Sequence, residues 1–152
     1  MALEKLDLPT TLKKIGSFII LYCGQLKELN IPYGITTIGR WSFYNYASNK
    51  NLLKNIELPN SVTTIENGAF SWRTNLEQIN IPEGVTSIED EVFSGCKALK
   101  NITIPSSVKT MGAYVFSGDT ITINVPFKEG EKPEGWDDNW NTGAECTINY
   151  AK

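Results

Sequence analysis

Hydrophobic and polar residues alternate along the chain in a phrase that recurs at a nearly constant interval. The phrase has leucine or isoleucine at its first, fourth and sixth positions and proline at its seventh, and it occurs at Leu3–Pro9, Leu26–Pro32, Leu53–Pro59, Leu76–Pro82 and Leu99–Pro105. A degraded copy ends at Pro126, so successive prolines lie 23, 27, 23, 23 and 21 residues apart. A fixed period of about 20–29 residues with leucine or isoleucine at set offsets predicts a leucine-rich solenoid.

Each phrase predicts a short strand that is buried on one face. The residues one and three places before each proline are apolar, whereas most of those two and four places before it are polar. A period of two is that of a half-buried strand, and proline, which lacks an N–H donor, suits the end of a strand. The polar positions include Asn30, Asn55, Gln78, Asn80 and Asn101. We expect these amides to form a stacked, outward-facing surface, which makes them candidate ligand-binding residues for a protein or glycan. The alternative is that a solvated sheet face is polar in any case.

The residues after each proline predict a second extended segment and then a column of large apolar side chains. Two apolar residues spaced three apart, such as Val85 and Ile88, follow each of the first five prolines, mostly with threonine or serine between them. Eleven places after these prolines stand Ile20, Phe43, Phe70, Phe93 and Phe116. The return to the next strand is too short for a crossover helix. The predicted fold is therefore a repeat solenoid, mostly β, with parallel strands and short helical or 3-10 turns.

Two units carry the residues of a known repeat. Residues 81–99 read IPEGVTSIEDEVFSGCKAL, and residues 58–76 read LPNSVTTIENGAFSWRTNL, which has Arg73 where the first has cysteine. Over residues 3–126 the chain resembles the BspA-type leucine-rich-repeat family of bacterial surface proteins, whose unit is roughly I-P-x-x-V-T-x-I-G-x-x-A-F-x-x-C-x-x-L. It departs from that pattern at Ile20, at four extra residues near Ser48–Asn51, and at Asp119, which replaces a cysteine.

The resemblance implies a recognition or adhesion module that is one part of a larger bacterial surface protein. Its implied location is the cell surface or the secreted fraction, and its implied partner is a host or matrix protein, or a glycan. No catalytic residues carry over from the family. A structural spacer with no ligand of its own is the alternative that the sequence leaves open.

The pattern predicts one domain over residues 1–152, with repeats over about 3–126 and a C-terminal cap over 127–152. The cap segment contains Trp136 and Trp140 and ends in an expected strand at Cys146–Tyr150. We expect no signal peptide in this chain, because MALEKLDLP leads directly into the first repeat. A formal net charge of -3 gives no basic footprint for nucleic acid, and no apolar run is long enough to predict membrane insertion.

Candidate chemistry is sparse, so we expect no enzyme, cofactor or metal site. The chain contains no histidine, which excludes Ser-His-Asp and Cys-His sites and histidine-ligated metals. Asp137, Asn139 and Asn141 begin like a calcium loop, but Ile148 stands where the loop needs glutamate. The three cysteines are predicted to be free thiols, since an odd number at wide spacing does not form a disulfide framework.

Aromatic residues outside the core register are the second set of ligand-binding candidates. Tyr22, Tyr44 and Trp72 fall at loop positions, where exposed rings serve as hot spots for a protein or as platforms for a sugar. The alternative is that these rings cover the loops of neighbouring units. A separate expectation concerns residues 3–20, whose open strand edge and apolar side chains predict either that a longer repeat array continues upstream or that the chain self-associates through its N-terminal end.

Overall fold

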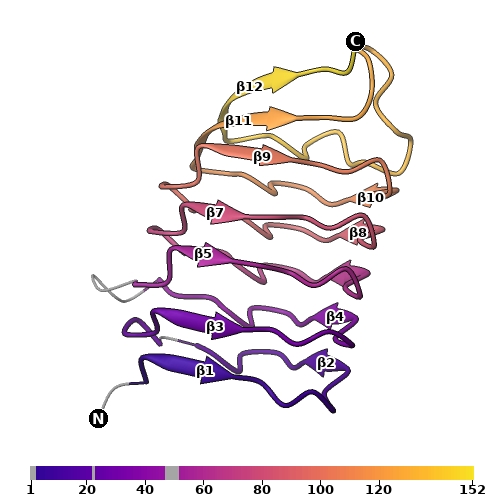
Figure 1. The fold of residues 1–152 in the computed structure, drawn as a ribbon. Helices are drawn as coiled ribbons and strands as arrows, with labels where there is room; N and C mark the ends of the chain where they lie inside the picture. Colours follow the sequence, from indigo (N-terminus) through magenta and orange to yellow (C-terminus); the bar gives the residue numbers. More distant parts are fainter. Residues whose placement is uncertain (1–2, 22, 47–51) are drawn as a thin grey trace.

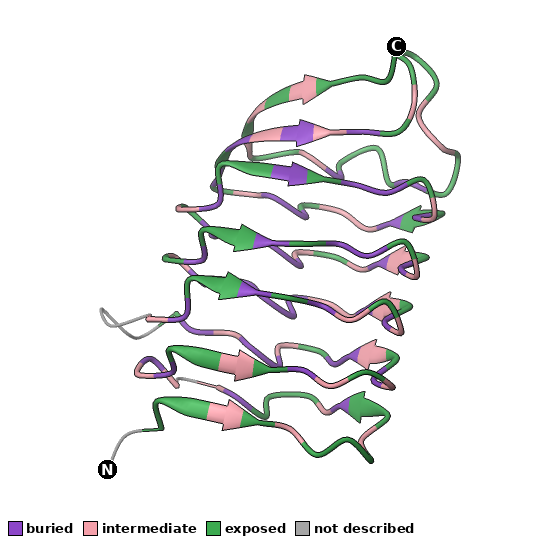
Figure 2. Cartoon of the chain, in the orientation of Figure 1, coloured by how far each residue is buried: buried purple, intermediate pink, exposed green. Residues whose placement is uncertain are grey.

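The computed structural model describes residues 3–21, 23–46 and 52–152, and these form a parallel-strand β-solenoid (Figure 1). Each repeat makes one coil, and the coils stack so that equivalent strands lie beside one another. Among the described residues there is no helix. The short strands and turns of successive coils enclose one continuous core, which is buried inside the stack (Figure 2).

The strands that precede the repeat prolines, together with the final strand of the chain, form the first ladder. Its members are β1 (Lys5–Asp7), β3 (Glu28–Asn30), β5 (Asn55–Ile56), β7 (Gln78–Ile79), β9 (Asn101–Thr103), β11 (Thr120–Asn124) and β12 (Glu145–Asn149). All pairs are parallel and in the register of the repeat, with Leu6 beside Leu29 and Ile56 beside Ile79. The ladder has three parts, β1-β3, β5-β7 and β9-β11-β12. The predicted alternation is present, because the inward residues are buried or half-buried between exposed polar ones.

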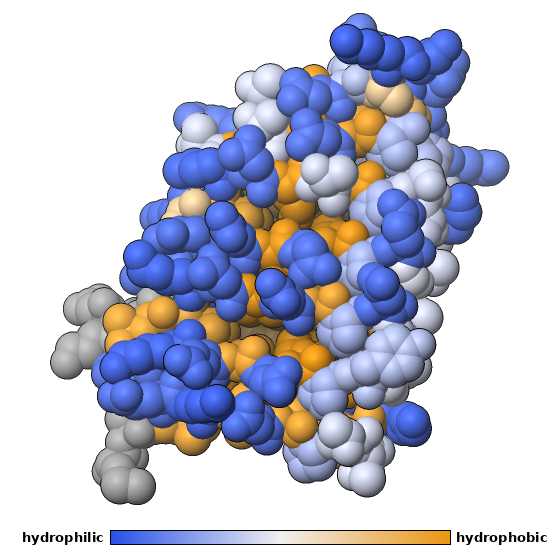
Figure 3. Space-filling model, viewed as in Figure 1, coloured by the Kyte–Doolittle hydropathy of each residue, from blue (hydrophilic) through white to orange (hydrophobic). Residues whose placement is uncertain are grey.

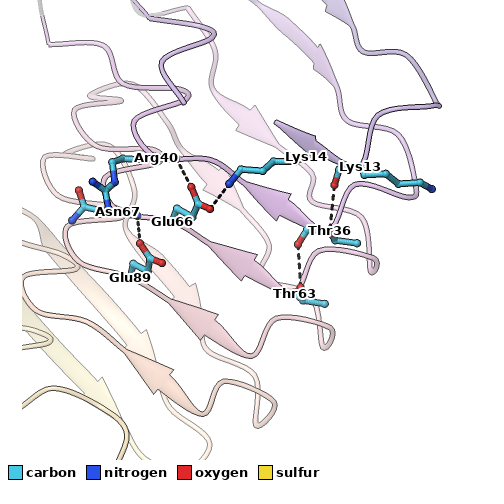
Figure 4. A network of polar contacts seen from close by, with 8 residues as sticks. All are labelled: Lys13, Lys14, Thr36, Arg40, Thr63, Glu66, Asn67 and Glu89. Atoms are coloured by element: carbon cyan, nitrogen blue, oxygen red, sulfur yellow. Dashed lines mark hydrogen bonds and ion pairs between the residues drawn. The ribbon is translucent and has the colours of Figure 1, made fainter. Parts of the chain in front are cut away.

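The second ladder runs without interruption through five coils. It consists of β2 (Lys14–Ile15), β4 (Thr37–Ile38), β6 (Thr64–Ile65), β8 (Ser87–Ile88) and β10 (Thr110–Met111). The predicted threonine ladder is present on it. The hydroxyl of Thr36 donates to the carbonyl oxygen of Lys13 at 3.1 Å, and that of Thr63 donates to the carbonyl of Thr36 at 3.1 Å (Figure 4). These bonds tie each coil to the one before it.

The predicted phenylalanine column forms the centre of the core. Ring centroids lie 5.2 Å apart for Phe43 and Phe70, and 5.7 Å apart for Phe70 and Phe93 and for Phe93 and Phe116. The rings are nearly parallel, with interplanar angles of 8°, 6° and 11°. All four phenylalanines have no measurable exposure. The repeat length places one ring per coil at the same point.

The segments around this column are turns and not the short helical turns that the sequence suggested. Nine and thirteen places after the proline, the backbone takes a positive φ: Trp41 has φ 52°, Trp72 has φ 60° and Gly95 has φ 75°. A residue in the left-handed region interrupts a right-handed helix, so the two such positions in each of the third, fourth and fifth units, and the one described in each of the first two, keep the segment in separate turns.

The last 26 residues, 127–152, cover the C-terminal end of the core with a divergent coil. Trp140 stands edge-on to Phe116 with ring centroids 6.2 Å apart, which extends the aromatic column by one ring. Trp136 is 1% exposed and joins the second ladder through a bridge to Met111. The final strand, β12, pairs with β11 over five residues and begins one residue earlier than the sequence suggested.

Candidate functional site

The outer face of the first ladder carries most of the predicted ligand-binding side chains. Asn30, Asn55, Gln78, Asn80 and Asn101 are all exposed, and each is adjacent in the chain to a buried or half-buried residue. Figure 3 shows this face, with polar side chains standing over an apolar floor. The stacking of the coils therefore brings residues from separate repeats onto one surface.

A shallow groove of about 930 Å³ crosses this face over β5, β7 and β9. Its rim includes Asn55, Gln78, Asn80 and Asn101, and its floor includes Ile79 and Ile81, which are each 8% exposed. A smaller hollow of about 480 Å³ lies over β3 and β5 and is lined by Asn30 and Asn55. The two hollows share Asn55, so the five predicted amides border one extended surface.

The amides of this surface are not equivalent. Asn80 accepts a hydrogen bond from the backbone N–H of Leu58 at 2.8 Å and donates one to the carbonyl oxygen of Leu58 at 3.0 Å. Both of its amide atoms are thereby engaged in holding β7 to the coil before it. In the described part of the chain, the side chains of Asn55, Gln78 and Asn101 make no such bond, so their donors and acceptors face solvent.

The charge of the groove is mildly acidic. Its lining includes Glu57, Glu77 and Glu83 against a single cation, Lys100. Glu77 is also paired with Lys54 at 2.8 Å, in an exposed ion pair that contributes little free energy. A polar partner that is neutral or basic fits this combination of carboxylates and free amides.

The predicted aromatic residues lie in the turns and not in the groove. Tyr46, which is 62% exposed, stands edge-on to Trp72 with ring centroids 4.7 Å apart, and Tyr44 stands edge-on to Trp41 at 5.3 Å. Tyr22 lies outside the described residues. None of the residues that line the groove is one of these aromatics.

The two tryptophans also cover the next coil. A Cβ at Gly68 would come within 2.4 Å of the Trp41 ring, and a Cβ at Gly95 would come within 3.0 Å of the Trp72 ring. Both rings are half-buried. This packing matches the alternative that the sequence left open, in which the rings cover neighbouring units.

The acidic residues beside the second ladder have structural partners. Glu66 pairs with Lys14 and also accepts from the backbone N–H of Arg40 at 3.0 Å. Glu89 accepts from the backbone N–H of Asn67 at 2.9 Å (Figure 4). These carboxylates close the turns between coils. Among the described residues, no group of three or more acidic or cysteine side chains is arranged to hold a metal ion.

A buried polar column, which the sequence pattern did not predict, runs beside the phenylalanines. It consists of Arg73, Cys96 and Asp119, which all stand fourteen places after a repeat proline. The guanidinium of Arg73 donates to the carbonyl oxygen of Phe43 and, at 3.3 Å, to that of Ile20. Burial lowers the pKa of Arg73 to about 10, against smaller opposing effects of Cys23 and Cys96. The signal was present in the sequence, since Arg73 and Asp119 replace the cysteine of the repeat.

The fold and the amide-bearing face define a leucine-rich-repeat solenoid. More particularly, the chain belongs to the BspA type leucine rich repeat region family, whose model matches six copies over residues 1–124. In the described residues, no helix is long and apolar enough to cross a membrane.

Solved structures with the same fold include a leucine-rich-repeat protein of T. pallidum and the pneumococcal vaccine antigen PcpA. The first has a TM-score of 0.67 and 23% identity, over 83% of this chain and 61% of that one. The second has a TM-score of 0.72 and 22% identity, over 99% of this chain and 42% of that one. A leucine-rich-repeat protein from Bacteroides ovatus matches with a TM-score of 0.50 and 20% identity, over 96% and 55% of the two chains. The chain therefore spans less than two thirds of each of these proteins. No curated protein matches the chain.

Proposed function

We propose that the chain is a non-enzymatic recognition module that binds a protein segment or a glycan through the groove over β5, β7 and β9. It acts as part of a larger bacterial surface protein, exposed at the cell surface or secreted. The family to which the chain belongs supports the surface location, and the three longer solved structures are consistent with a module of a larger protein.

One observation carries the proposal. Asn55, Gln78 and Asn101 present free amides in one row, over a floor that retains some apolar exposure. A solvated sheet face is polar in any case, so the support for a ligand is that these amides are untied, unlike that of Asn80, and border a groove. Free amides beside carboxylates suit the hydroxyls of a sugar or the backbone and basic side chains of a peptide.

The proposal is tested by the triple variant Asn55→Ala, Gln78→Ala and Asn101→Ala. Binding is measured to two probe sets, an array of purified glycans and a panel of immobilised matrix proteins such as fibronectin and collagen. We expect the triple variant to lose at least tenfold in affinity for any probe that the wild type captures, with unchanged thermal stability.

The variant Tyr33→Ala is the matched control, because Tyr33 is 76% exposed and lies outside the groove. Two results contradict the proposal: wild-type affinity of the triple variant for every captured probe, or no capture by the wild type. The second result favours the spacer function.

A further inference from the structure

Asp119 is a buried acid to which no described residue donates a hydrogen bond. It is 2% exposed, and neither of its carboxylate oxygens has a hydrogen-bond partner in residues 3–21, 23–46 and 52–152. An ionised carboxylate only accepts hydrogen bonds, and its burial without a donor is strongly unfavourable. This repeat position faces the core, because Cys96, which stands at the same position in the preceding coil, is also buried.

The other members of the column show what a side chain does at this position. The thiol of Cys96 donates to the carbonyl oxygen of Phe70 at 3.3 Å. The guanidinium of Arg73 donates to the carbonyl oxygen of Phe43. In both cases the side chain is a donor to the phenylalanine of the preceding coil. The equivalent acceptor for Asp119 is the carbonyl oxygen of Phe93.

That carbonyl has room for one more donor. It accepts the backbone N–H of Cys96 at 3.1 Å, and a carbonyl oxygen has two lone pairs. The carbonyl oxygen of Phe70 already accepts two bonds, from the backbone N–H of Arg73 at 3.2 Å and from the Cys96 thiol. In the next coil, only protonated Asp119 can donate the corresponding second hydrogen bond to the Phe93 carbonyl oxygen, because an ionised carboxylate has no proton to donate.

We propose that Asp119 is held in the folded protein as a neutral carboxylic acid whose O–H donates to the Phe93 carbonyl oxygen, and that loss of this proton to solvent loosens the C-terminal coil. The point of action is the junction between the last two coils. β11 begins directly after Asp119, and the carbonyl oxygen of Asp119 accepts the backbone N–H of Glu145 at 2.8 Å.

The charged and titratable groups around Asp119 come from the coils on both sides. Cys96, Lys97 and Lys100 belong to the preceding coil, and Glu145 and Cys146 to the following one. Burial raises the pKa of Asp119 to about 8, and the smaller effects of Lys100 and Lys97 oppose that rise. Burial is also the main cause that raises the pKa of the Cys96 thiol well above its usual value, so Cys96 keeps its proton over the same range.

The direction of the pH effect follows from these protonation states. The folded protein holds the Asp119 proton up to a pKa of about 8, whereas the unfolded chain releases it near the ordinary aspartate pKa of about 3.9. Folding is therefore favoured most at acidic pH, and this contribution is lost progressively as the pH rises from about 4 through about 8. An aspartate in a salt bridge has the opposite effect, because its contribution to stability is lost as the pH falls.

The first test is the carboxyl carbon resonance of Asp119, followed by NMR from pH 4 to pH 9.5 in the wild-type chain. We expect its midpoint near pH 8, and a midpoint near 4 would overturn the proposal. This measurement needs no variant, so it decides the question even where a substitution prevents folding.

The second test compares unfolding by urea at pH 5 and pH 8.5 in the wild type, in Asp119→Asn and in Glu129→Gln. The unfolding equilibrium constant of the wild type should rise by at least tenfold more than that of Asp119→Asn, because asparagine has no proton to lose. Glu129 is exposed, so Glu129→Gln should keep the wild-type pH dependence.

Hydrogen exchange locates the effect. In the wild type, the backbone amides of Ile121 to Asn124 should lose exchange protection before those of β7 as the pH rises. Parallel pH profiles for the wild type and Asp119→Asn would contradict the proposal.

Discussion

At the scale of single residues, the structure shows that a position in the repeat is defined by its neighbours in adjacent coils. Gly68 and Gly95 are required where the tryptophan of the preceding coil lies against the backbone. The positive φ at Gly68, 61°, makes a side chain there unfavourable for a second reason. The identity of a residue in one coil therefore depends on a residue that is more than twenty positions away.

The phenylalanine column gives a prediction for stability. Phe70 and Phe93 are each enclosed by a stacked ring on both sides, so replacement of either by alanine should cost about 3–5 kcal/mol of unfolding free energy. Phe127 is half-buried and packs against the tail aromatics Trp136 and Tyr150, so Phe127→Ala should cost clearly less. Chemical denaturation of the three variants measures the difference. Equal losses at the three positions would mean that the stacked column carries no special share of the stability.

At the scale of elements, the strands are short, and a side chain forms hydrogen bonds to the backbone where the strand pairing ends. β5 and β7 pair over only two residues, Asn55 with Gln78 and Ile56 with Ile79. Beyond that point the side chain of Asn80 supplies both an acceptor and a donor to the backbone of Leu58. It thus replaces a pair of ladder bonds between these two coils.

Removal of this side chain should weaken the ladder. Asn80→Ala leaves the N–H and the carbonyl of Leu58 without their partner, at a cost of about 1–3 kcal/mol. Gln78→Ala, two residues away on the same face, removes an exposed side chain and should change the unfolding free energy by less than about 0.5 kcal/mol. Thermal or urea unfolding of both variants tests the distinction. Near-equal stabilities would show that Asn80 is not part of the sheet.

The sequence was sufficient for the features that follow from hydrophobic periodicity, and insufficient for the turn geometry and for contacts that depend on particular side chains in adjacent coils. The two ladders, the outward amides and the phenylalanine column each recur at one offset, so their alignment by stacking was predictable. The role of Asn80 in the sheet was not predictable, because its partner Leu58 lies 22 residues away in the sequence. The equivalent position in the preceding repeat, two places before the proline, is Glu57 and not an amide. The burial of Asp119 was not predictable either, because it depends on the residues of the adjacent coils, which the sequence of a single repeat does not specify.

At the scale of the whole molecule, the two ends of the solenoid differ. The C-terminal end is covered by Trp136 and Trp140, which are 1% and 6% exposed. At the other end Phe18 and Ile19 are 54% and 59% exposed, and Leu6, Leu8 and Leu12 are only half-buried. The outer edge of β1 is unpaired in the described part of the chain. An open edge beside exposed apolar residues is a surface for strand pairing.

We propose that two copies of the chain associate through this end. Antiparallel pairing of two β1 strands about Leu6 would set Lys5 of each copy opposite Asp7 of the other, which is electrostatically favourable. Light scattering should detect dimers that Leu6→Lys weakens. The matched substitution Ile148→Lys, at an inward, half-buried position of β12 at the opposite end, should leave them intact. A strict monomer, with residues 3–9 as well protected from hydrogen exchange as residues 76–82, would overturn this proposal.

The central claim is that partners bind on the outer face of β5, β7 and β9. It is tested most directly by NMR mapping of backbone amides as the chain is titrated with a glycan or matrix protein that it captures. We predict that the largest shift changes fall on Asn55 to Glu57, Gln78 to Asn80 and Asn101 to Thr103, with smaller changes in the second ladder. Changes centred on Tyr44, Tyr46 and Trp72, with the groove unaffected, would contradict the claim.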